Sequence, residues 1–387
     1  MAKTFAPQIF APKIEQELAQ LVAEAQAPFH LQGLGSKPFL GNPVDTTQVL
    51  SLKHFTGVEI YEPEELILEA GAATGLAAIQ NLLKKRGQML AFEPPDYSSL
   101  MGTTSAGSLG GIVAAGLSGP RRIRAGAARD HVLGFRGVAG NGERLKAGAR
   151  VVKNVTGYDL PKIATGSFGS LVAMTSVIVK VLPLPETEET LVFKGLDDAT
   201  AVRLMSEAMQ SAADVSGAAH LPGDVTCLRL DGIAPSIAFR RDKLLQTLGR
   251  DAGVLGEKES AKLWTGIRDA KPFWSLSEAS IWRISVTPSE GAAIAAHMAE
   301  GMDTRHFFDW AGGLIWLAVR GEADGGAAKV RASFTSGHAT LLRAPEAVRR
   351  SVSAFQPQPA ALAALSERVK AAFDPQSLFN PGIMVRG

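Results

Sequence analysis

The N-terminal half of the chain begins with a helical pattern of apolar residues. Between residues 12 and 27, apolar side chains recur three and four positions apart, at Ile14, Leu18, Leu21 and Val22. Residues at this spacing fall on one face of a helix, so the pattern predicts an amphipathic helix that buries one side.

Patterns typical of strands follow in the rest of this half. They predict strands over residues 29–31, 66–70, 132–139, 143–147 and 171–182. Asn141-Gly142 is a hairpin turn signal between two of these strands, and Pro183 ends the last one. A helix is predicted over residues 76–86, because Gly87 stands where a C-terminal cap is favoured.

Beyond residue 186 the pattern becomes a mixture of helices and strands. It predicts helices over residues 199–212, 260–270, 289–302 and 345–352, and strands over residues 227–230, 281–286 and 314–319. A chain of 387 residues suits two domains of ordinary size. We therefore expect an α+β fold with a domain boundary near residue 185.

Charge is nearly balanced over the whole chain, with 40 Lys and Arg against 38 Asp and Glu, so no nucleic-acid partner is expected. Locally, nine Lys and Arg lie between Arg121 and Lys153, opposed only by Asp130 and Glu143. A solvated basic face is the default interpretation, and a surface for a dinucleotide or an acidic partner is the sharper hypothesis. Phe135 is the only Phe, Tyr or Trp in this segment, which argues against stacking on bases.

Cysteine content and hydropathy bear on the compartment and on redox groups. Cys227 is the only cysteine, so this chain alone offers neither an internal disulfide nor the four thiolates of an iron–sulfur cluster. No apolar run approaches the roughly 18 residues of a membrane span, and residues 1–11 lack the apolar core of a signal peptide. We expect a soluble cytoplasmic protein, or one held at the inner membrane through partners.

Two glycine-rich segments are candidates for binding an anion. In the turn Gly33-Leu34-Gly35-Ser36-Lys37, glycines let backbone N–H groups turn toward a pyrophosphate, although a simple turn is the more common meaning of such a motif. Residues 105–116 are mostly small, and a helix starting near Gly110 would direct its first N–H groups at a phosphate. The alternative is tight helix–sheet packing. Neither segment is a Rossmann fingerprint or a Walker loop.

The histidines offer no metal site at local spacing, because no His-x-His or His-x-x-x-His pair occurs. His338, in Ser336-Gly337-His338-Ala339-Thr340, is the most interesting of them as a candidate active-site group. A structural histidine is the more common interpretation of one such residue. No Gly-x-Ser-x-Gly elbow supports a hydrolase.

Taken in order, these motifs resemble the FAD-binding domain of the vanillyl-alcohol oxidase and p-cresol methylhydroxylase superfamily. The resemblance covers residues 25–185 and the tail Phe379-Asn380-Pro381-Gly382, and its motifs stand at residues 33–37, 108–114, 126–134, 153–160 and 166–171. Within that superfamily, further stretches resemble one family, the smaller FAD-binding subunits of bacterial glycolate oxidases (glycolate dehydrogenases). These stretches are residues 93–95, 114–122, 309–316 and 337–344.

The resemblance implies a domain plan and a cofactor. It implies a two-lobed FAD-binding domain of the p-cresol methylhydroxylase (PCMH) type over residues 1–185, a smaller α+β cap over residues 186–345, and a C-terminal segment, residues 346–387, that returns to the FAD domain. The turn offers no His or Cys to tether a flavin, so bound, non-covalent FAD is expected. The implied cofactor-binding residues are Gly33, Leu34, Gly35, Ser36, Gly107, Ser108, Leu109, Gly110 and Gly111 around the pyrophosphate, with Gly166 to Val172 lining the adenine end.

The family also implies partners and a reaction. A larger flavoprotein subunit and an iron–sulfur subunit would complete an enzyme that oxidises glycolate, a small 2-hydroxy acid, to glyoxylate and passes the electrons to an acceptor. We assign no catalytic residue and no metal site.

Two departures from the family pattern leave alternatives open. Leu34 stands where the first turn usually has glycine, so either Leu34 avoids a positive φ or the turn is altered and no longer holds FAD. The motif His-x-Gly-Asp-Gly-Asn-x-His of the larger subunit is absent, which counts against independent oxidation by this chain. The alternatives are a stand-alone FAD-linked dehydrogenase of another 2-hydroxy acid, a non-catalytic FAD-binding structural or electron-relay subunit, and a scaffold without cofactor.

Overall fold

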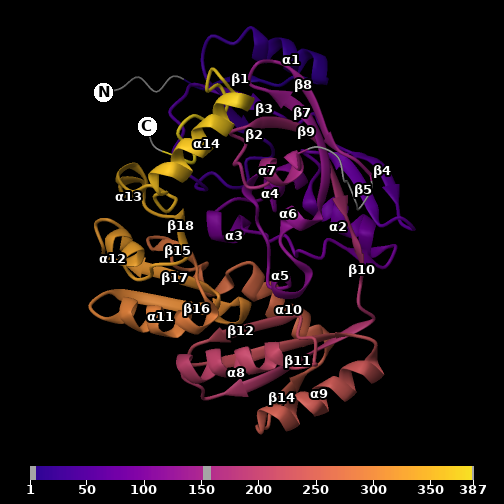
Figure 1. The fold of residues 1–387 in the computed structure, drawn as a ribbon, viewed down its shortest axis with the longest axis vertical. Helices are drawn as coiled ribbons and strands as arrows, with labels where there is room; N and C mark the ends of the chain where they lie inside the picture. The colour runs from indigo at the N-terminus through magenta and orange to yellow at the C-terminus, as the bar shows by residue number, and fades with distance from the viewer. Residues whose placement is uncertain (1–5, 151–157, 386–387) are drawn as a thin grey trace. The chain divides into compact units, whose positions relative to one another are not determined.

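A computed structural model describes residues 6–150 and 158–385 (Figure 1). The chain divides into two compact units. Unit 1 comprises residues 1–117, 127–183 and 357–387, and unit 2 comprises residues 118–126 and 184–356. No helix in the described ranges is both long and apolar enough to cross a membrane.

Unit 1 is built on a five-stranded antiparallel sheet. In spatial order its strands are β4 (Val58–Glu62), β5 (Ile67–Gly71), β9 (Val172–Lys180), β7 (Val132–Ala139) and β8 (Arg144–Gly148). Strand β9 lies at the centre and is buried on both faces up to Ile178 and Val179, as its β-branched sequence favours. The helices around this sheet are α2 (Leu76–Lys84), α3 (Ser98–Met101), α4 (Leu109–Ala115), α6 (Ala128–His131) and α7 (Leu160–Ala164).

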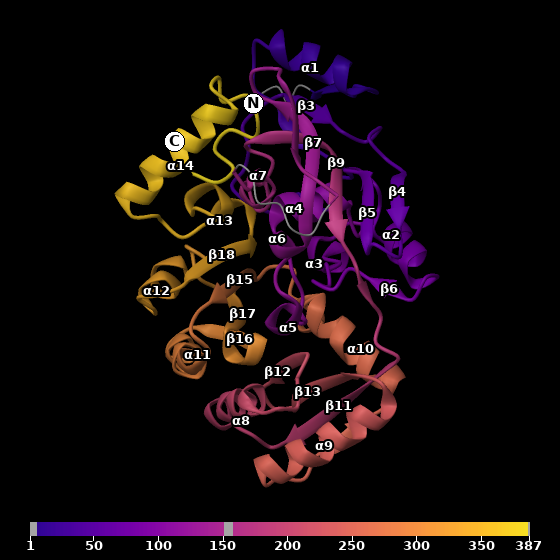
Figure 2. The ribbon, with the colours of Figure 1, turned by 45° about the vertical axis from the view of Figure 1, so that its right-hand side comes forward.

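A smaller parallel sheet in the same unit brings residues 8–10 and 30–51 together. Its order is β1 (Gln8–Phe10), β3 (Gln48–Ser51) and β2 (His30–Gln32), and helix α1 (Glu15–Ala23) packs beside it. Leu18 and Val22 of α1 are buried, and they share one hydrophobic cluster with Phe29 and Phe379. The C-terminal segment, yellow in Figures 1 and 2, therefore returns to the N-terminal segments, in indigo, after helix α14 (Ala360–Phe373). A short pair, β6 (Gln88–Met89) and β10 (Leu182–Pro183), completes the unit.

Unit 2 is an eight-stranded sheet whose neighbouring strands are all antiparallel. Its order is β14 (Gly253–Leu255), β11 (Thr187–Lys194), β13 (Val225–Gly232), β12 (Gly217–Leu221), β16 (Asp303–Asp309), β17 (Leu314–Arg320), β15 (Ser280–Ser285) and β18 (His338–Arg343). Helices α8 (Asp198–Gln210) and α9 (Ala234–Leu248) lie side by side against it (Figure 2). The remaining helices are α5 (Arg122–Ala125), α10 (Glu257–Arg268), α11 (Gly291–Ala299), α12 (Ala327–Ala332) and α13 (Glu346–Ser351), with single 3-10 turns at Lys271–Phe273, Pro288–Glu290 and Trp310–Gly312.

The α+β class predicted from the sequence is confirmed, and the predicted elements are present with small shifts at their ends. The structure adds elements that the pattern did not predict, notably β11, α9 and α14. The boundaries of the two units also differ from the predicted domains, residues 1–185, 186–345 and 346–387. Residues 118–126 and 346–356 group with unit 2, because their contacts are with that unit rather than with unit 1.

Candidate functional site

The glycine turn at residues 33–37 follows a strand that the C-terminal tail holds in place. It follows β2, where the Leu31 N–H donates to Asn380 Oδ1 at 2.8 Å. Asn380 Nδ2 in turn donates to the Phe168 carbonyl at 2.8 Å. One side chain from the C-terminal tail therefore ties β2 to the turn at residues 166–170. The sequence marked Asn380 only as part of a tail motif and indicated no role for it.

The backbone of this turn presents a run of available donors. None of the N–H groups from Gly33 to Ser36 donates to another described residue. Gly35 has a φ of 64°, whereas Leu34 is not in the positive-φ region and is 41% exposed. Leu34 thus avoids the strain that a glycine position would impose on it. Consecutive unpaired N–H groups in such a turn favour an anion.

The segment around Gly107 forms the second wall of the same site. A Cβ atom on Gly107 would lie 2.5 Å from Ser36 Oγ and 2.6 Å from Lys37 Nζ, and one on Gly33 would lie 3.0 Å from Ser108 Oγ. The Thr103 hydroxyl also donates to the Ser36 carbonyl at 3.1 Å. The structure therefore brings the two predicted glycine segments together, and only glycine leaves room between them.

The first turn of α4 differs from the prediction. The helix begins at Leu109, and Ser108 caps it by accepting from the Gly111 N–H at 3.3 Å. The Leu109 N–H donates to the Thr74 carbonyl at 3.0 Å and the Gly110 N–H to the Ala72 carbonyl at 2.8 Å. These three N–H groups therefore have acceptors within the described chain, unlike those from Gly33 to Ser36. A Cβ on Gly110 would lie 2.6 Å from Ala72 Cβ, which makes Gly110 a packing residue.

The third predicted segment, Gly166 to Val172, packs at the other end of α4. The Gly166 N–H donates to the Val113 carbonyl at 3.0 Å and the Phe168 N–H to the Ala114 carbonyl at 2.8 Å. Phe168 has a φ of 54°, which is costly for an aromatic residue. Val172 is buried as the first residue of β9. Asn380 is the link between this turn and the strand that leads to residues 33–36.

Lys37 supplies a cation at the glycine turn. Its Nζ donates to Ser36 Oγ at 3.0 Å. Burial lowers the pKa of Lys37 to about 8, and the charge of Asp96 opposes part of that effect. A bound anion would stabilise the charged form of this amine. Lys37 was inside the predicted turn but was not among the predicted binding residues.

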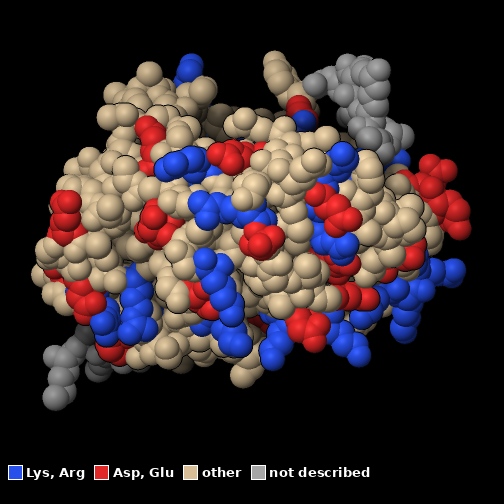
Figure 3. Space-filling model, turned by 90° about the horizontal axis from the view of Figure 1, so that it is seen from below, with Lys and Arg blue, Asp and Glu red and all other residues tan. Residues whose placement is uncertain are grey.

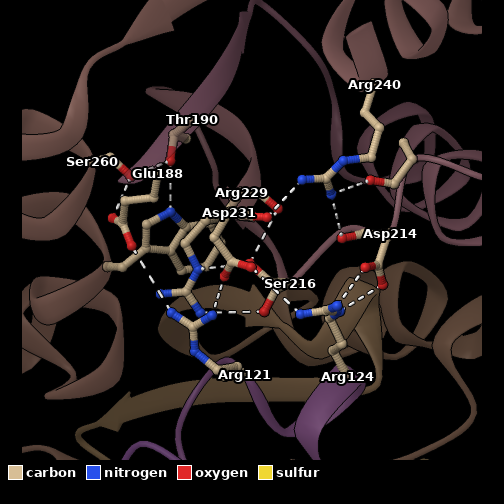
Figure 4. Close-up of polar contacts among 12 residues, drawn as sticks. Arg121, Arg124, Glu188, Thr190, Asp214, Ser216, Arg229, Asp231, Arg240 and Ser260 are labelled. Carbon is tan, nitrogen blue, oxygen red and sulfur yellow. Dashed lines mark hydrogen bonds and ion pairs between the residues drawn. The ribbon is translucent and has the colours of Figure 1, made fainter. Parts of the chain in front are cut away.

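Four arginines of the basic segment that starts at Arg121 pair with carboxylates. In unit 2, the buried guanidinium of Arg121 contacts Asp231 and lies 3.9 Å from Glu188 (Figure 4). Arg124 pairs with Asp214 across a 2.5 Å hydrogen bond. Arg121 is buried and therefore lies outside the predicted solvated basic face, whereas Arg124, Arg129, Arg144 and Lys146 are exposed.

Farther along the basic segment, the arginines pair within unit 1. Arg136 lies 2.5 Å from Glu59 and 3.7 Å from Glu69, and Arg150 lies 2.8 Å from Glu69. Lys153 falls outside the described residues. Figure 3, which draws the molecule from below, shows blue and red side chains interspersed over that face. The hypothesis of a basic surface for a dinucleotide therefore has no support among these pairs.

The histidine singled out in the sequence is exposed rather than a buried structural residue. His338 is the first residue of β18. Its pKa is lowered by partial burial and by the charges of Arg283 and Arg122. In the described part of the chain, no group of three or more His, Cys, Asp or Glu residues could hold a metal ion. Cys227 is buried, and burial raises the pKa of its thiol.

Comparisons with known proteins agree with this geometry. Residues 6–148 match the model of an FAD-binding domain. An alkyldihydroxyacetonephosphate synthase structure superposes with a TM-score of 0.66 at 15% identity, covering 96% of this chain and 76% of that one, and shows the shared fold. Fold and domain match together define a flavoprotein of the PCMH type.

The sequence relatives identify the family. Glycolate oxidase subunit GlcE of Escherichia coli (strain K12) is 33% identical over 376 residues, which cover 97% of each chain. This chain belongs to that family of glycolate oxidase subunits. Glycolate oxidase subunit GlcD of Bacillus subtilis (strain 168) is 27% identical over 298 residues, 76% of this chain and 57% of the relative.

Proposed function

We propose that this chain is the smaller FAD-binding subunit of a complex that oxidises glycolate to glyoxylate. The observation that carries the proposal is the run of unpaired N–H groups from Gly33 to Ser36, facing a segment where Gly107 leaves space. Membership of the GlcE family supports the choice of substrate. FAD, when bound, would accept the two electrons that leave the hydroxy acid.

The residues present fit the pyrophosphate of FAD. The N–H groups of residues 33–36 would donate to the phosphate oxygens, Lys37 would offset their charge, and Gly107 would allow close approach. The turn at residues 166–172, tied to β2 through Asn380, would line the adenine end. No His or Cys lies within residues 33–37, so the cofactor would be held without a covalent bond.

Partners would complete the reaction. Electrons leaving the flavin need an acceptor, and the single buried thiol of Cys227 cannot hold an iron–sulfur cluster. A larger flavoprotein subunit and an iron–sulfur subunit would fill these roles, and the names of the GlcE and GlcD relatives support a multi-subunit enzyme. The complex would be cytoplasmic, with attachment to the inner membrane through those partners as the alternative.

A second candidate function is a stand-alone FAD-linked dehydrogenase of another 2-hydroxy acid. A D-lactate dehydrogenase of Anaerostipes hadrus is 29% identical to this chain. The match spans only 155 residues, 40% of this chain and 31% of the relative. It therefore supports a shared FAD domain more than a shared substrate. A third candidate is a subunit that binds FAD without turnover of its own.

The first experiment is the visible spectrum of the purified chain. Absorption near ~450 nm and ~370 nm, released by acid precipitation, is expected for non-covalent FAD. Glycolate oxidation is then measured with a dye acceptor, with and without co-expressed partners. Turnover only with partners supports the proposal, and turnover by the chain alone favours the stand-alone enzyme. A colourless protein that takes up no added FAD contradicts the flavoprotein proposal.

The cation of Lys37 predicts how FAD affinity depends on pH. The free protein loses this charge as the pH rises through about 8, whereas the bound pyrophosphate keeps the amine protonated to higher pH. FAD binding therefore takes up a proton, and affinity is expected to fall about 10-fold between pH 7 and pH 9. Flavin fluorescence titrations at both pH values measure this change.

That prediction is checked by comparing the substitution of the buried Lys37 with the substitution of an exposed lysine, Lys162. Lys37→Met is expected to bind FAD more weakly at pH 7 and to lose most of the pH dependence. Lys162→Met removes an exposed lysine that pairs with Asp159 at 2.8 Å, and it is expected to behave like the unaltered chain. An unchanged pH profile in Lys37→Met would show that another group controls the effect.

A further inference from the structure

One arginine in unit 2 has no acidic partner, in contrast to the arginines of Figure 4. Arg121 and Arg124 contact Asp231 and Asp214, whereas the side chain of Arg283 makes no hydrogen bond or ion pair with any described residue. Its Nε is buried and has no hydrogen-bond partner. A partly buried guanidinium left in this state favours binding of an external anion.

Two other cationic or titratable side chains lie near Arg283. In the sheet, Arg283 of β15 pairs with Thr340 of β18, and Ser285 pairs with His338. Residues 283 and 338 therefore project from the same face as diagonal neighbours, roughly 7–8 Å apart at their backbones. Arg122 of α5 is the third member, and its charge together with that of Arg283 acts on His338.

Tryptophan rings position the two guanidinium groups. The Arg283 guanidinium lies 5.3 Å from the ring centroid of Trp310 and 5.5 Å from that of Trp316, and Arg122 lies 4.4 Å from Trp310. Trp310 is fixed by an indole N–H donated to the Gly119 carbonyl at 3.1 Å. Such stacking orients the planar cations, and it leaves the N–H edge of Arg283 to donate to a ligand.

Electrostatics and exposure indicate the kind of ligand. The pKa of His338 is lowered by burial first and by Arg283 and Arg122 second, so these groups repel a further positive charge. An anion between them would relieve that repulsion. Arg122 and His338 are exposed, so a small ligand can reach the cluster. The planar, forked donors of arginine suit a carboxylate, and the indole rings suit a small organic body.

We propose that Arg283, Arg122 and His338 form a binding site for the carboxylate of a small 2-hydroxy acid or of its 2-oxo acid product. The inference rests on the proposed function and assigns the recognition of the acid group to unit 2. Arg283 provides the anchoring charge, and Arg122 and His338 complete the site.

The test measures binding of glycolate, and separately of glyoxylate, to the full chain by isothermal titration calorimetry, with flavin content recorded for every variant. Arg283→Gln is expected to weaken binding of both acids at least ~10-fold, and Arg122→Gln to weaken it several-fold. Arg320→Gln is the matched control, because Arg320 is an exposed arginine on β17 that pairs with Asp303 at 2.8 Å. Ethylene glycol, which lacks the carboxylate, is expected not to compete.

A pH series gives a second readout of the same site. Affinity for glycolate is expected to rise as the pH falls below the ordinary imidazole value of ~6.5, because the bound carboxylate favours protonated His338. His338→Gln should abolish that rise. Equal binding by the unaltered chain, Arg283→Gln and Arg122→Gln, or no binding of either acid to the unaltered chain, overturns the inference.

The outcome is separable from the test of the proposed function. A chain that holds FAD and oxidises glycolate with its partners, while Arg283→Gln and Arg122→Gln bind the acid normally, refutes this site alone. A chain that takes up no FAD but binds glycolate through Arg283 refutes the flavoprotein proposal and keeps the site.

Discussion

Replacing Asp374 with alanine is expected to lower the free energy of unfolding of unit 1 by about 3–5 kcal/mol. The Asp374 side chain is fully buried, accepts from the Leu378 and Phe379 N–H groups at 2.9 and 2.8 Å, and pairs with Lys370. Its removal leaves two buried N–H groups unpaired and takes the counter-charge from a partly buried amine. Denaturant unfolding followed by circular dichroism measures the loss.

The same substitution is expected to weaken FAD binding. Asp374 organises the turn that leads to Asn380, and Asn380 links β2 to the Phe168 carbonyl. Asp159→Asn serves as the control, because Asp159 forms an exposed ion pair with Lys162, which is worth at most ~1 kcal/mol. If Asp374→Ala proves as stable as Asp159→Asn, the tail does not hold unit 1 together.

Replacing Gly107 with alanine is expected to reduce FAD affinity by more than about 100-fold, which corresponds to ~2.7 kcal/mol. Gly107 has a φ of 93°, and its added methyl group would lie 2.5 Å from Ser36 Oγ and 2.6 Å from Lys37 Nζ. The Lys37 side chain can move, but Ser36 is short and buried, so the turn at residues 33–36 must shift. Equilibrium titration with FAD, followed by fluorescence quenching, measures the change.

The control for Gly107 separates backbone strain from crowding. Gly87 has a φ of 63°, and an added Cβ there would meet nothing within 4 Å. Gly87→Ala is therefore expected to cost about 1 kcal/mol of stability and to leave FAD affinity unchanged. Equal FAD affinity in Gly107→Ala and the unaltered chain would exclude the space between Gly107 and Ser36 as the cofactor site.

Elements with a strong local pattern were predictable from the sequence. The strand over residues 132–139 is β7, with the same ends. Helices α9 and α14 were not predicted. Only Ile237 and Leu244 of α9 are buried, so most of that helix faces away from the core. Helix α14 does have apolar residues three and four positions apart, at Leu362, Leu365, Val369 and Phe373, although none of its residues is buried.

The candidate site, too, was predictable from the sequence only in part. Gly33 to Ser36 and Gly107 were chosen because glycines at these positions suit an anion, and the structure places them together. The assignment of Leu109, Gly110 and Gly111 to the cofactor site stays a prediction. The sequence could not show that the Leu109 and Gly110 N–H groups donate to the carbonyls of Thr74 and Ala72, because these acceptors lie about 35 positions away in the chain. Asn380 was missed as a positioning residue, since it acts on Leu31 from 349 positions away.

By itself, the sequence determined the α+β class, the order of the FAD-binding motifs and the family, because these depend on local periodicity and on residue types at short spacing. Only the tertiary structure decided which N–H groups remain available and that residues 118–126 belong to unit 2. It also decided that Arg283 and Arg122 lie over the ring of Trp310, where their charges act on His338. Hydrogen-bond saturation and charge pairing depend on contacts between segments far apart in the chain, and no local pattern encodes them.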